Sequence, residues 1–225
     1  MNGVKVTNLS ENELEEICRE IGDSFYDYDY GRKKDRTIEY GFRKILGSRE
    51  SMYQHMKACF LAGYESGCIY STSDRGEGYI FITYKGQELS FRSTIRMIGA
   101  VIKNLGGIRK GLQYVKRIAK GGATYEEELK KKKIPYVNLI MLVVRKEYQG
   151  QGYMRQLLEM LYEIADEKNL AVVLDTDAES KVEKYEHLGL KLVKTRDLGE
   201  GVYLYDLYRP AAKNSMPDKR KGVFS

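Results

Sequence analysis

The sequence is poor in the side chains that build metal sites and disulfide frameworks. Among its 225 residues are three cysteines, an odd number, and two histidines, His55 and His187. The cysteines, Cys18, Cys59 and Cys68, do not follow the paired spacing of a zinc site. We therefore expect no bound metal and no disulfide framework, and we predict that the three cysteines are buried free thiols.

Long hydrophobic runs are also absent. No apolar stretch approaches the roughly 20 residues of a membrane-spanning helix, and residues 1–3 do not begin the apolar core of a signal peptide. The sequence contains no internal repeat and no low-complexity block. A chain of 225 residues can bury one sizeable core without a disulfide or a metal. We expect a single domain in the cytoplasm, with no membrane partner.

The net charge of +6 raises the question of a nucleic-acid partner. Basic residues gather in three segments, at 103–120, 130–133 and 213–221. In the second, three glutamates at 126–128 precede the lysines by three or four residues, a spacing typical of a solvated helix with ion pairs. No aromatic-rich nucleic-acid motif accompanies these segments. We therefore expect no nucleic-acid partner, and we attribute part of the charge to attraction of a phosphorylated ligand.

The most informative segment is 143–158, where an apolar strand leads through a glycine-bearing turn into a helix. Gly150 and Gly152 let the backbone approach a ligand without interference from Cβ atoms. The free amides of the first helical turn, with the positive end of the helix dipole behind them, favour an anion. The pattern therefore predicts a site for the pyrophosphate of a phosphorylated cofactor.

The spacing of the glycines excludes two common nucleotide-binding motifs. A dinucleotide-binding turn has a third glycine three residues after the second, where this sequence has Arg155. A P-loop ends in Gly-Lys-Ser or Gly-Lys-Thr, and neither tripeptide occurs in the sequence.

The turn instead resembles a different cofactor motif. Residues 149–153, Gln-Gly-Gln-Gly-Tyr, follow an apolar strand that ends at Val144, and they resemble the acetyl-CoA signature of the GNAT superfamily of N-acetyltransferases. The family pattern is Gln/Arg-Gly-x-Gly-x-Gly/Ala, introduced by Val-x-Pro. Lys146 replaces the proline and Met154 replaces the last glycine or alanine. Because backbone amides hold the pyrophosphate, neither departure removes the predicted anion site.

A second segment lies where the family places its closing motif. Residues 171–174 predict a buried strand, and 182–188 predict a short helix closed by Gly189. Residues 185–190, Tyr-Glu-His-Leu-Gly-Leu, resemble the family motif Tyr-x-x-x-Gly-Phe. The resemblance implies that Tyr185 lies near the thioester sulfur and is the catalytic general acid for the departing thiolate. Reference pKa values near 10 and 8.5 make full proton transfer uphill by roughly 2 kcal/mol, so we expect Tyr185 to act mainly as a hydrogen-bond donor.

The resemblance also implies which residues bind acetyl-CoA. The amides of residues 150–155 would hold the pyrophosphate, a backbone amide near Val144 would polarise the thioester carbonyl, and Lys181 stands where the family often has asparagine. The implied cofactor-binding residues are Leu142, Val143, Val144, Gln149, Gly150, Gln151, Gly152, Tyr153, Met154, Arg155 and Lys181.

The general base and the reaction route are predicted as follows. Ile140 stands where the family often has a glutamate, so Asp175 and Asp177 are the candidate bases, with a relayed water as an equal alternative. We expect direct attack of an amine on acetyl-CoA without a covalent acetyl-enzyme. Cys68 is disfavoured as a nucleophile, because it lies in an apolar strand without a histidine nearby in the sequence.

The hydrophobic pattern and the resemblance together predict an α/β fold, a single GNAT-like domain with a mixed, mostly antiparallel central sheet flanked by helices. A largely apolar strand at 136–144 is typical of the centre of a sheet. Paired strands are expected at 67–71 and 78–84, and again at 191–193 and 202–208. The helix after the glycine turn has one apolar face, made of Met154, Leu157, Leu158, Leu161, Ile164 and Ala165.

The domain is expected to span 1–210 and to contain a helical insertion at 86–135, before the cofactor strand, with two helices separated by a glycine pair. Residues 211–225 are predicted to form a basic C-terminal tail. At the other end, a strand at 4–6 precedes a helix that opens with a capping box at 10–13.

The tyrosines and aspartates at 23–30 allow two interpretations: they line the acceptor side and meet a cationic amine, or they form an exposed turn with packed tyrosines. The predicted function is transfer of an acetyl group from acetyl-CoA to an amine of a small molecule or peptide. The alternative is a non-catalytic acyl-CoA-binding module with a regulatory or scaffold role. The prediction allows a homodimer and assigns no metal ligand.

Overall fold

The computed structural model of the protein describes residues 3–31, 33–34 and 38–212. Most of the predicted basic tail, residues 213–225, lies outside the described residues. The strands are β1 (Val4–Lys5), β2 (Ile69–Ser71), β3 (Gly78–Tyr84), β4 (Tyr136–Val144), β5 (Ala171–Thr176), β6 (Lys191–Gly199) and β7 (Val202–Arg209). The helices are α1 (Glu11–Tyr26), α2 (Gly41–Leu46), α3 (Arg49–Glu65), α4 (Phe91–Asn104), α5 (Ile108–Lys120), α6 (Tyr125–Lys131), α7 (Tyr153–Glu167) and α8 (Glu179–His187), with a 3₁₀ turn η1 (Lys146–Tyr148).

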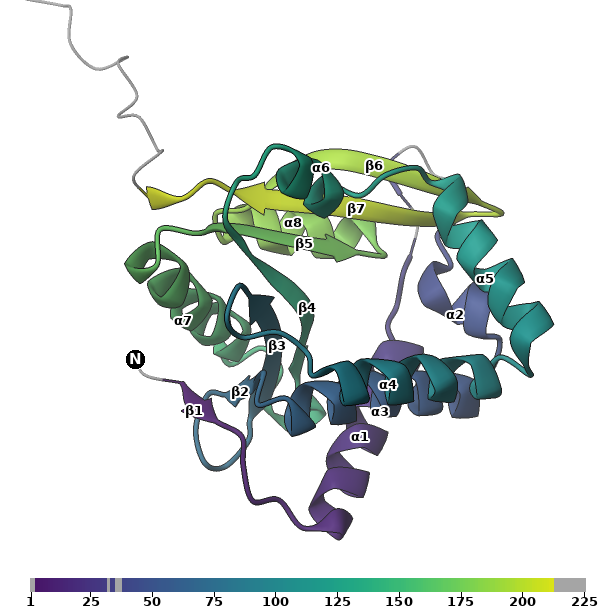
Figure 1. The fold of residues 1–225 in the computed structure, drawn as a ribbon, viewed down its shortest axis with the longest axis horizontal. Coiled ribbons are helices and arrows are strands. Elements are labelled where there is room, and N and C mark those ends of the chain that lie inside the picture. The colour runs from purple at the N-terminus through teal and green to yellow at the C-terminus, as the bar shows by residue number, and fades with distance from the viewer. Residues whose placement is uncertain (1–2, 32, 35–37, 213–225) are drawn as a thin grey trace, which may run out of the picture.

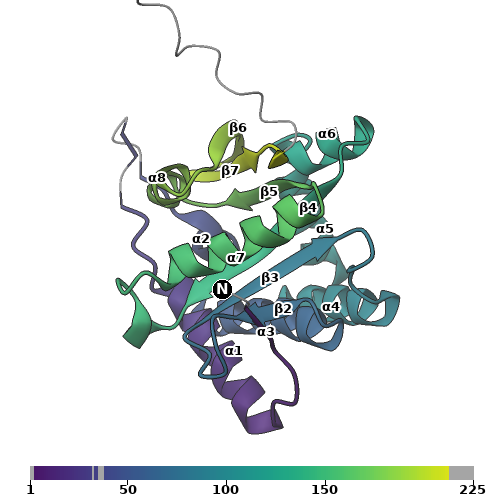
Figure 2. The same cartoon turned by 90° about the vertical axis from the view of Figure 1, so that its left-hand side faces the viewer.

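The seven strands form one sheet in the order β1-β2-β3-β4-β5-β7-β6, with helices on both faces (Figures 1 and 2). Every neighbouring pair is antiparallel except β4 and β5, which are parallel. The predicted α/β fold with a mixed, mostly antiparallel sheet is therefore confirmed. No helix in the described part of the chain is long and apolar enough to span a bilayer.

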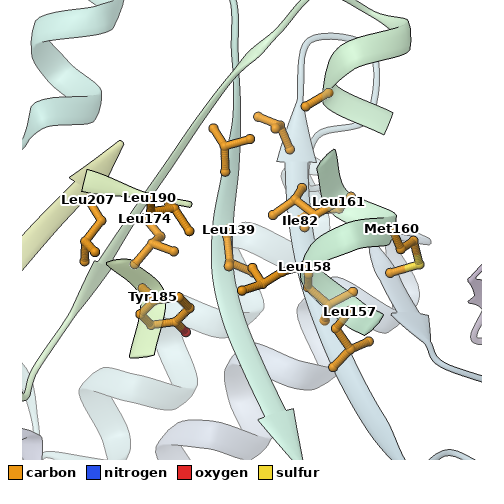
Figure 3. Packing of buried hydrophobic residues seen from close by; sticks show 14 of the residues in the cluster. Ile82, Leu139, Leu157, Leu158, Met160, Leu161, Leu174, Tyr185, Leu190 and Leu207 are labelled. Carbon is orange, nitrogen blue, oxygen red and sulfur yellow. The ribbon is translucent and has the colours of Figure 1, made fainter. Parts of the chain in front are cut away.

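Two hydrophobic clusters hold helices against opposite faces of the sheet. On one face, α7 contributes Leu157, Leu158 and Leu161 to a cluster with Ile80 and other residues of the central strands (Figure 3). On the other face, α1 and α3 pack against alternate residues of the same strands. Burial of each large aliphatic side chain contributes about 1.5–3 kcal/mol. Strand β3 is therefore covered on both faces.

Local sequence signals account for several helix and turn boundaries. At the start of α1, the Glu13 amide donates to the Ser10 hydroxyl at 3.3 Å and the Ser10 amide donates to Glu13 at 2.7 Å, which confirms the capping box. The insertion forms α4 and α5, broken at Gly106 and Gly107, followed by a third helix, α6. β6 extends beyond its predicted end, because it pairs with β7 up to a tight turn in which Glu200 and Gly201 both have positive φ.

The sheet is split at its centre between β4 and β5. Their parallel pairing joins Tyr136–Leu139 to Ala171–Leu174 and then stops, although β4 continues to Val144 beside β3. The register between β3 and β4 shifts so that Ile140 forms a bulge, and its side chain is 41% exposed. Figure 1 shows the two strands diverging beyond the paired part. The second half of β4 therefore presents an unpaired backbone edge within the described protein.

Candidate active site

A turn built on two glycines joins β4 to α7. Gly150 has φ of 76° and Gly152, the N-cap of α7, has φ of 87°, both in the left-handed region that glycine adopts without strain. The first hydrogen bond of the helix runs from the Gln156 amide to the Gly152 carbonyl at 3.2 Å. The amides of residues 153–155 therefore precede the helical ladder, as in any helix start without a side-chain cap.

This turn is open to solvent and fits a diphosphate. A Cβ atom built on Gly150 or on Gly152 meets no protein atom within 4 Å, and the residues from Gln149 to Gly152 are exposed. Among the described residues, no group accepts a hydrogen bond from the amides of 150–155. Free amides at the positive end of a helix dipole are suited to an anion. The residues present therefore match the phosphate end of coenzyme A.

Side chains around the turn brace its backbone. The side-chain amide of Gln149 donates a hydrogen bond to the Val144 carbonyl at 3.1 Å, and the side-chain amide of Gln151 donates one to the Glu147 carbonyl at 2.8 Å. At the end of β4, Arg145 makes two hydrogen bonds to Glu20, at 2.6 and 2.9 Å, and fixes the strand to α1. The two glutamines therefore have a bracing role that their place in the sequence motif did not reveal.

The predicted cofactor residues on β4 and α7 point in different directions. Leu142 and Val144 pack toward α7, whereas the Val143 side chain is buried in the opposite cluster and has only its backbone available for a ligand. Met154 packs partly buried against the α7 cluster, so its bulk is directed into the protein. Arg155 is exposed one position later.

Tyr185 lies on α8 among the residues that pack between α7 and the sheet (Figure 3). In Figure 3 its hydroxyl points toward β4. Within the described residues this hydroxyl has no hydrogen-bond partner. Burial raises the pKa of Tyr185. A higher pKa makes full proton transfer from Tyr185 more costly and leaves the hydroxyl well suited to donate a hydrogen bond.

Lys181 is tied to its own helix and loop. Its ammonium group lies 2.7 Å from Asp177 and 4.2 Å from the centre of the Tyr28 ring. Asp177 also accepts hydrogen bonds from the Tyr30 hydroxyl at 2.6 Å and from the Phe42 amide at 3.0 Å. Burial opposes ionisation of Asp177, but Lys181 and these hydrogen bonds outweigh it and lower the pKa of the carboxyl. Asp177 therefore joins three segments and is a weak base.

The aromatic and acidic segment at 23–30 contains one buried tyrosine, Tyr30, and one partly exposed tyrosine near α8, Tyr28. Tyr30 is buried at 2% exposure against Asp177, in line with the packed interpretation. Tyr28 lies at the start of α8, where its hydroxyl is 2.9 Å from the Ser180 hydroxyl.

A buried charge network, which the sequence did not predict, lies next to Asp175, the other candidate base. Arg196 is 1% exposed and donates to Asp206 at 2.8 and 3.0 Å and also to Asp175. Asp206 further accepts the Tyr125 amide at 3.0 Å. The sequence signal was present in β7, where Asp206 falls in phase with the buried Val202 and Leu204.

Asp175 faces a small cavity. The cavity has a volume of about 50 Å³, and Asn138, Asp175 and Asp206 contribute to its wall between α6 and the sheet. The Asp175 side chain is 49% exposed. Its surroundings desolvate the carboxylate and raise its pKa, more than the Arg196 guanidinium lowers it.

The cysteines are free thiols in the structure, as predicted, with Cys18 and Cys68 buried and Cys59 half-buried. Burial raises the pKa of Cys18 to about 12 and that of Cys59 to about 11, and it also raises the pKa of Cys68. All three are therefore protonated at neutral pH. Among the described residues, no group of three or more histidine, cysteine, aspartate or glutamate side chains is placed to hold a metal ion.

Comparison with known proteins agrees with this arrangement. A family model described as acetyltransferase (GNAT) family matches residues 49–189, which is more than half of the chain and includes both the glycine turn and Tyr185. No curated protein sequence matches the chain significantly.

Solved structures share the fold at low identity. A Drosophila melanogaster polyamine N-acetyltransferase is 11% identical, with a TM-score of 0.53 over 90% of this chain and 97% of its own. An Aedes aegypti arylalkylamine N-acetyltransferase is 12% identical, with a TM-score of 0.51 over 91% and 97%. A Corynebacterium glutamicum protein described as a histone acetyltransferase and related acetyltransferase is 15% identical, with a TM-score of 0.50 over 97% and 99%.

Proposed function

The chain belongs to the GNAT acetyltransferase family, whose enzymes use acetyl-CoA as the acyl donor, and from that premise we propose how its own residues carry out the transfer. The protein is an acetyl-CoA-dependent N-acetyltransferase. Its acceptor, in this proposal, is a primary amine of a small molecule or peptide that attacks the thioester directly. The proposed compartment is the cytoplasm.

The cofactor site in this proposal consists mainly of backbone. The open amides at 150–155 hold the pyrophosphate, since they have no other partner among the described residues. The unpaired edge of β4 beyond Leu139 offers backbone groups to the rest of the cofactor, and an amide near Val144 polarises the acetyl carbonyl. This open turn beside the split in the sheet is the observation that carries the proposal.

Tyr185 stabilises the leaving group. Its unpartnered hydroxyl is free to donate a hydrogen bond to the thiolate as negative charge develops on sulfur. Because burial raises the pKa of Tyr185, this hydrogen bond contributes more than transfer of the proton. Lys181 contributes through Asp177, by fixing the loop beside α8.

Asp175 is the better placed of the two candidate bases. Its side chain is half exposed and faces a cavity, whereas Asp177 is occupied by three hydrogen-bonding groups and has a lowered pKa. The Asp175 carboxylate, which also accepts a hydrogen bond from Arg196, would take the proton of an incoming ammonium group directly or through a water. A covalent acetyl-cysteine is disfavoured because burial keeps the three thiols protonated.

The test combines binding with turnover. Calorimetry should detect 1:1 binding of coenzyme A, and thiol release should exceed the background with at least one member of a panel of polyamines, aminoglycosides, amino acids and peptides. Intact mass after incubation with acetyl-CoA alone should show no acetyl adduct. Binding without thiol release from any amine would count against the proposed acceptor class, and an acetyl adduct would count against direct attack.

A further inference from the structure

Helices α4 and α5 expose an unusual number of large apolar side chains. Phe91 is 82% exposed, Ile108 is 71% exposed and Leu112 is 57% exposed. We define the α4–α5 surface by the six residues Phe91, Ile95, Ile98, Ile108, Leu112 and Val115. On α5, Ile108, Leu112 and Val115 follow one another at spacings of four and three residues, which places them on one face of the helix, and exposed apolar faces of this kind mark a site of interaction.

These residues form stripes beside the packed faces of the helices. On α5, Gly111 lies against Ile102 of α4, and the Tyr114 ring is 6.2 Å from that of His55. Leu112 and Val115 each follow a packed residue by one position, which is about 100° around the helix. The packing of α5 on the protein therefore leaves this second apolar stripe uncovered. On α4, the exposed Ile95 and Ile98 are three residues apart and lie on one face of that helix.

The charged residues of α4, α5 and the segments that flank them are all basic. Between residues 89 and 125 the sequence has no acidic residue. Arg96 is paired with Glu65 at 2.7 Å and Arg117 with Glu200 at 3.0 Å. The remaining basic residues have no ion pair within the described part of the chain and are exposed: Arg92, Lys103, Arg109, Lys110, Lys116 and Lys120.

We propose that the α4–α5 surface binds an anionic lipid surface. A basic helix with an exposed apolar stripe and low overall hydrophobicity lies in the headgroup region of a membrane, where aliphatic side chains enter the acyl boundary and lysines meet anionic headgroups. A second copy of the chain would place these basic residues opposite one another in a two-fold contact. Nucleic acid would neutralise the charge but would leave the aliphatic stripes in water.

The position of the surface is compatible with catalysis. α3 covers the sheet face opposite α7, and α4 packs on α3. Figure 2 shows the start of α7 and helix α4 on opposite sides of the molecule. Docking through α4 and α5 therefore leaves the glycine turn accessible. The proposal differs from the expectation, based on sequence alone, that the protein has no membrane partner, and it does not depend on the acceptor.

Vesicle co-sedimentation of the full chain tests this inference. We expect binding to vesicles of phosphatidylcholine with phosphatidylglycerol, little binding to phosphatidylcholine alone, and release by high salt. The double variant Leu112→Asp/Val115→Asp should weaken binding at least about tenfold, because it removes aliphatic area and adds negative charge. Lys110→Gln/Lys116→Gln should do the same, since each basic residue contributes about fivefold.

Val193→Asp on β6 is the matched control, because Val193 is also exposed, at 39%, but lies outside the α4–α5 surface. It should bind as the wild type does, and circular dichroism should show that all variants fold. No binding of the wild type to anionic vesicles, or equal binding by the Leu112→Asp/Val115→Asp variant, overturns the proposal. A dimer in sedimentation velocity that this variant dissociates, without vesicle binding, would show that the surface is occupied by a second copy instead.

Discussion

Replacement of Gly152 by valine tests the cofactor turn most directly. Gly152 has φ of 87°, where a β-branched residue is strained by about 1–3 kcal/mol. A Cβ atom at this position meets no protein atom within 4 Å, so the free protein has room for the new side chain. We therefore expect Gly152→Val to fold, with its free energy of unfolding lowered by about 1–3 kcal/mol.

The effect on coenzyme A binding should be larger than the effect on stability. The valine side chain at Gly152 would occupy the open space through which a phosphate approaches the amides of 150–155. Loss of two hydrogen bonds to a charged group, at about 1.5–3 kcal/mol each, removes about 3–6 kcal/mol of binding free energy. This corresponds to a Kd raised on the order of 10² to 10⁴ times, which isothermal titration calorimetry measures.

Gly122 supplies the control for backbone strain. It lies between α5 and α6 with φ of 79°, and a Cβ atom there also meets nothing within 4 Å. Gly122→Val should lower the free energy of unfolding by a similar amount and leave the Kd for coenzyme A unchanged. If Gly152→Val binds coenzyme A as tightly as Gly122→Val, the turn does not hold the pyrophosphate and the reasoning is refuted.

Three further substitutions probe the rest of the site. Tyr185→Phe should lower kcat about 10- to 100-fold, the value of one hydrogen bond to a charged group, with an unchanged Kd for coenzyme A in steady-state and binding assays; an unaltered kcat would remove Tyr185 from the mechanism. Asp177→Asn should lower Tm at neutral pH. Because folding lowers the pKa of this carboxyl, the difference in Tm from the wild type should shrink as the pH falls below the reference value of 3.8. A difference in Tm that persists at low pH would contradict the assigned direction of the pKa shift. Arg196→Met should cost about 3–5 kcal/mol in urea unfolding by leaving buried Asp206 unpaired, and the added change Asp206→Leu should recover part of the loss; no recovery would argue against this pairing.

Local patterns predicted the elements that are governed by short-range chemistry. The capping box at Ser10, the strand, turn and helix around Gly152, and the glycine break between α4 and α5 all appear where the sequence places them. Helix α3 was not predicted, because it packs against both α1 and α4 and its apolar residues do not form a single face.

The sequence by itself determined the family resemblance, the glycine turn, the strands and most of the helices, because backbone conformation and hydrophobic periodicity depend on near neighbours. Tertiary structure alone decided that β4 and β5 separate after Leu139, that Lys181 binds Asp177, and that Arg196 is buried against Asp206. It also decided that the apolar stripes of α4 and α5 remain in solvent. These outcomes depend on which distant segments meet, and the free energy of a charge or an apolar side chain is set by that environment.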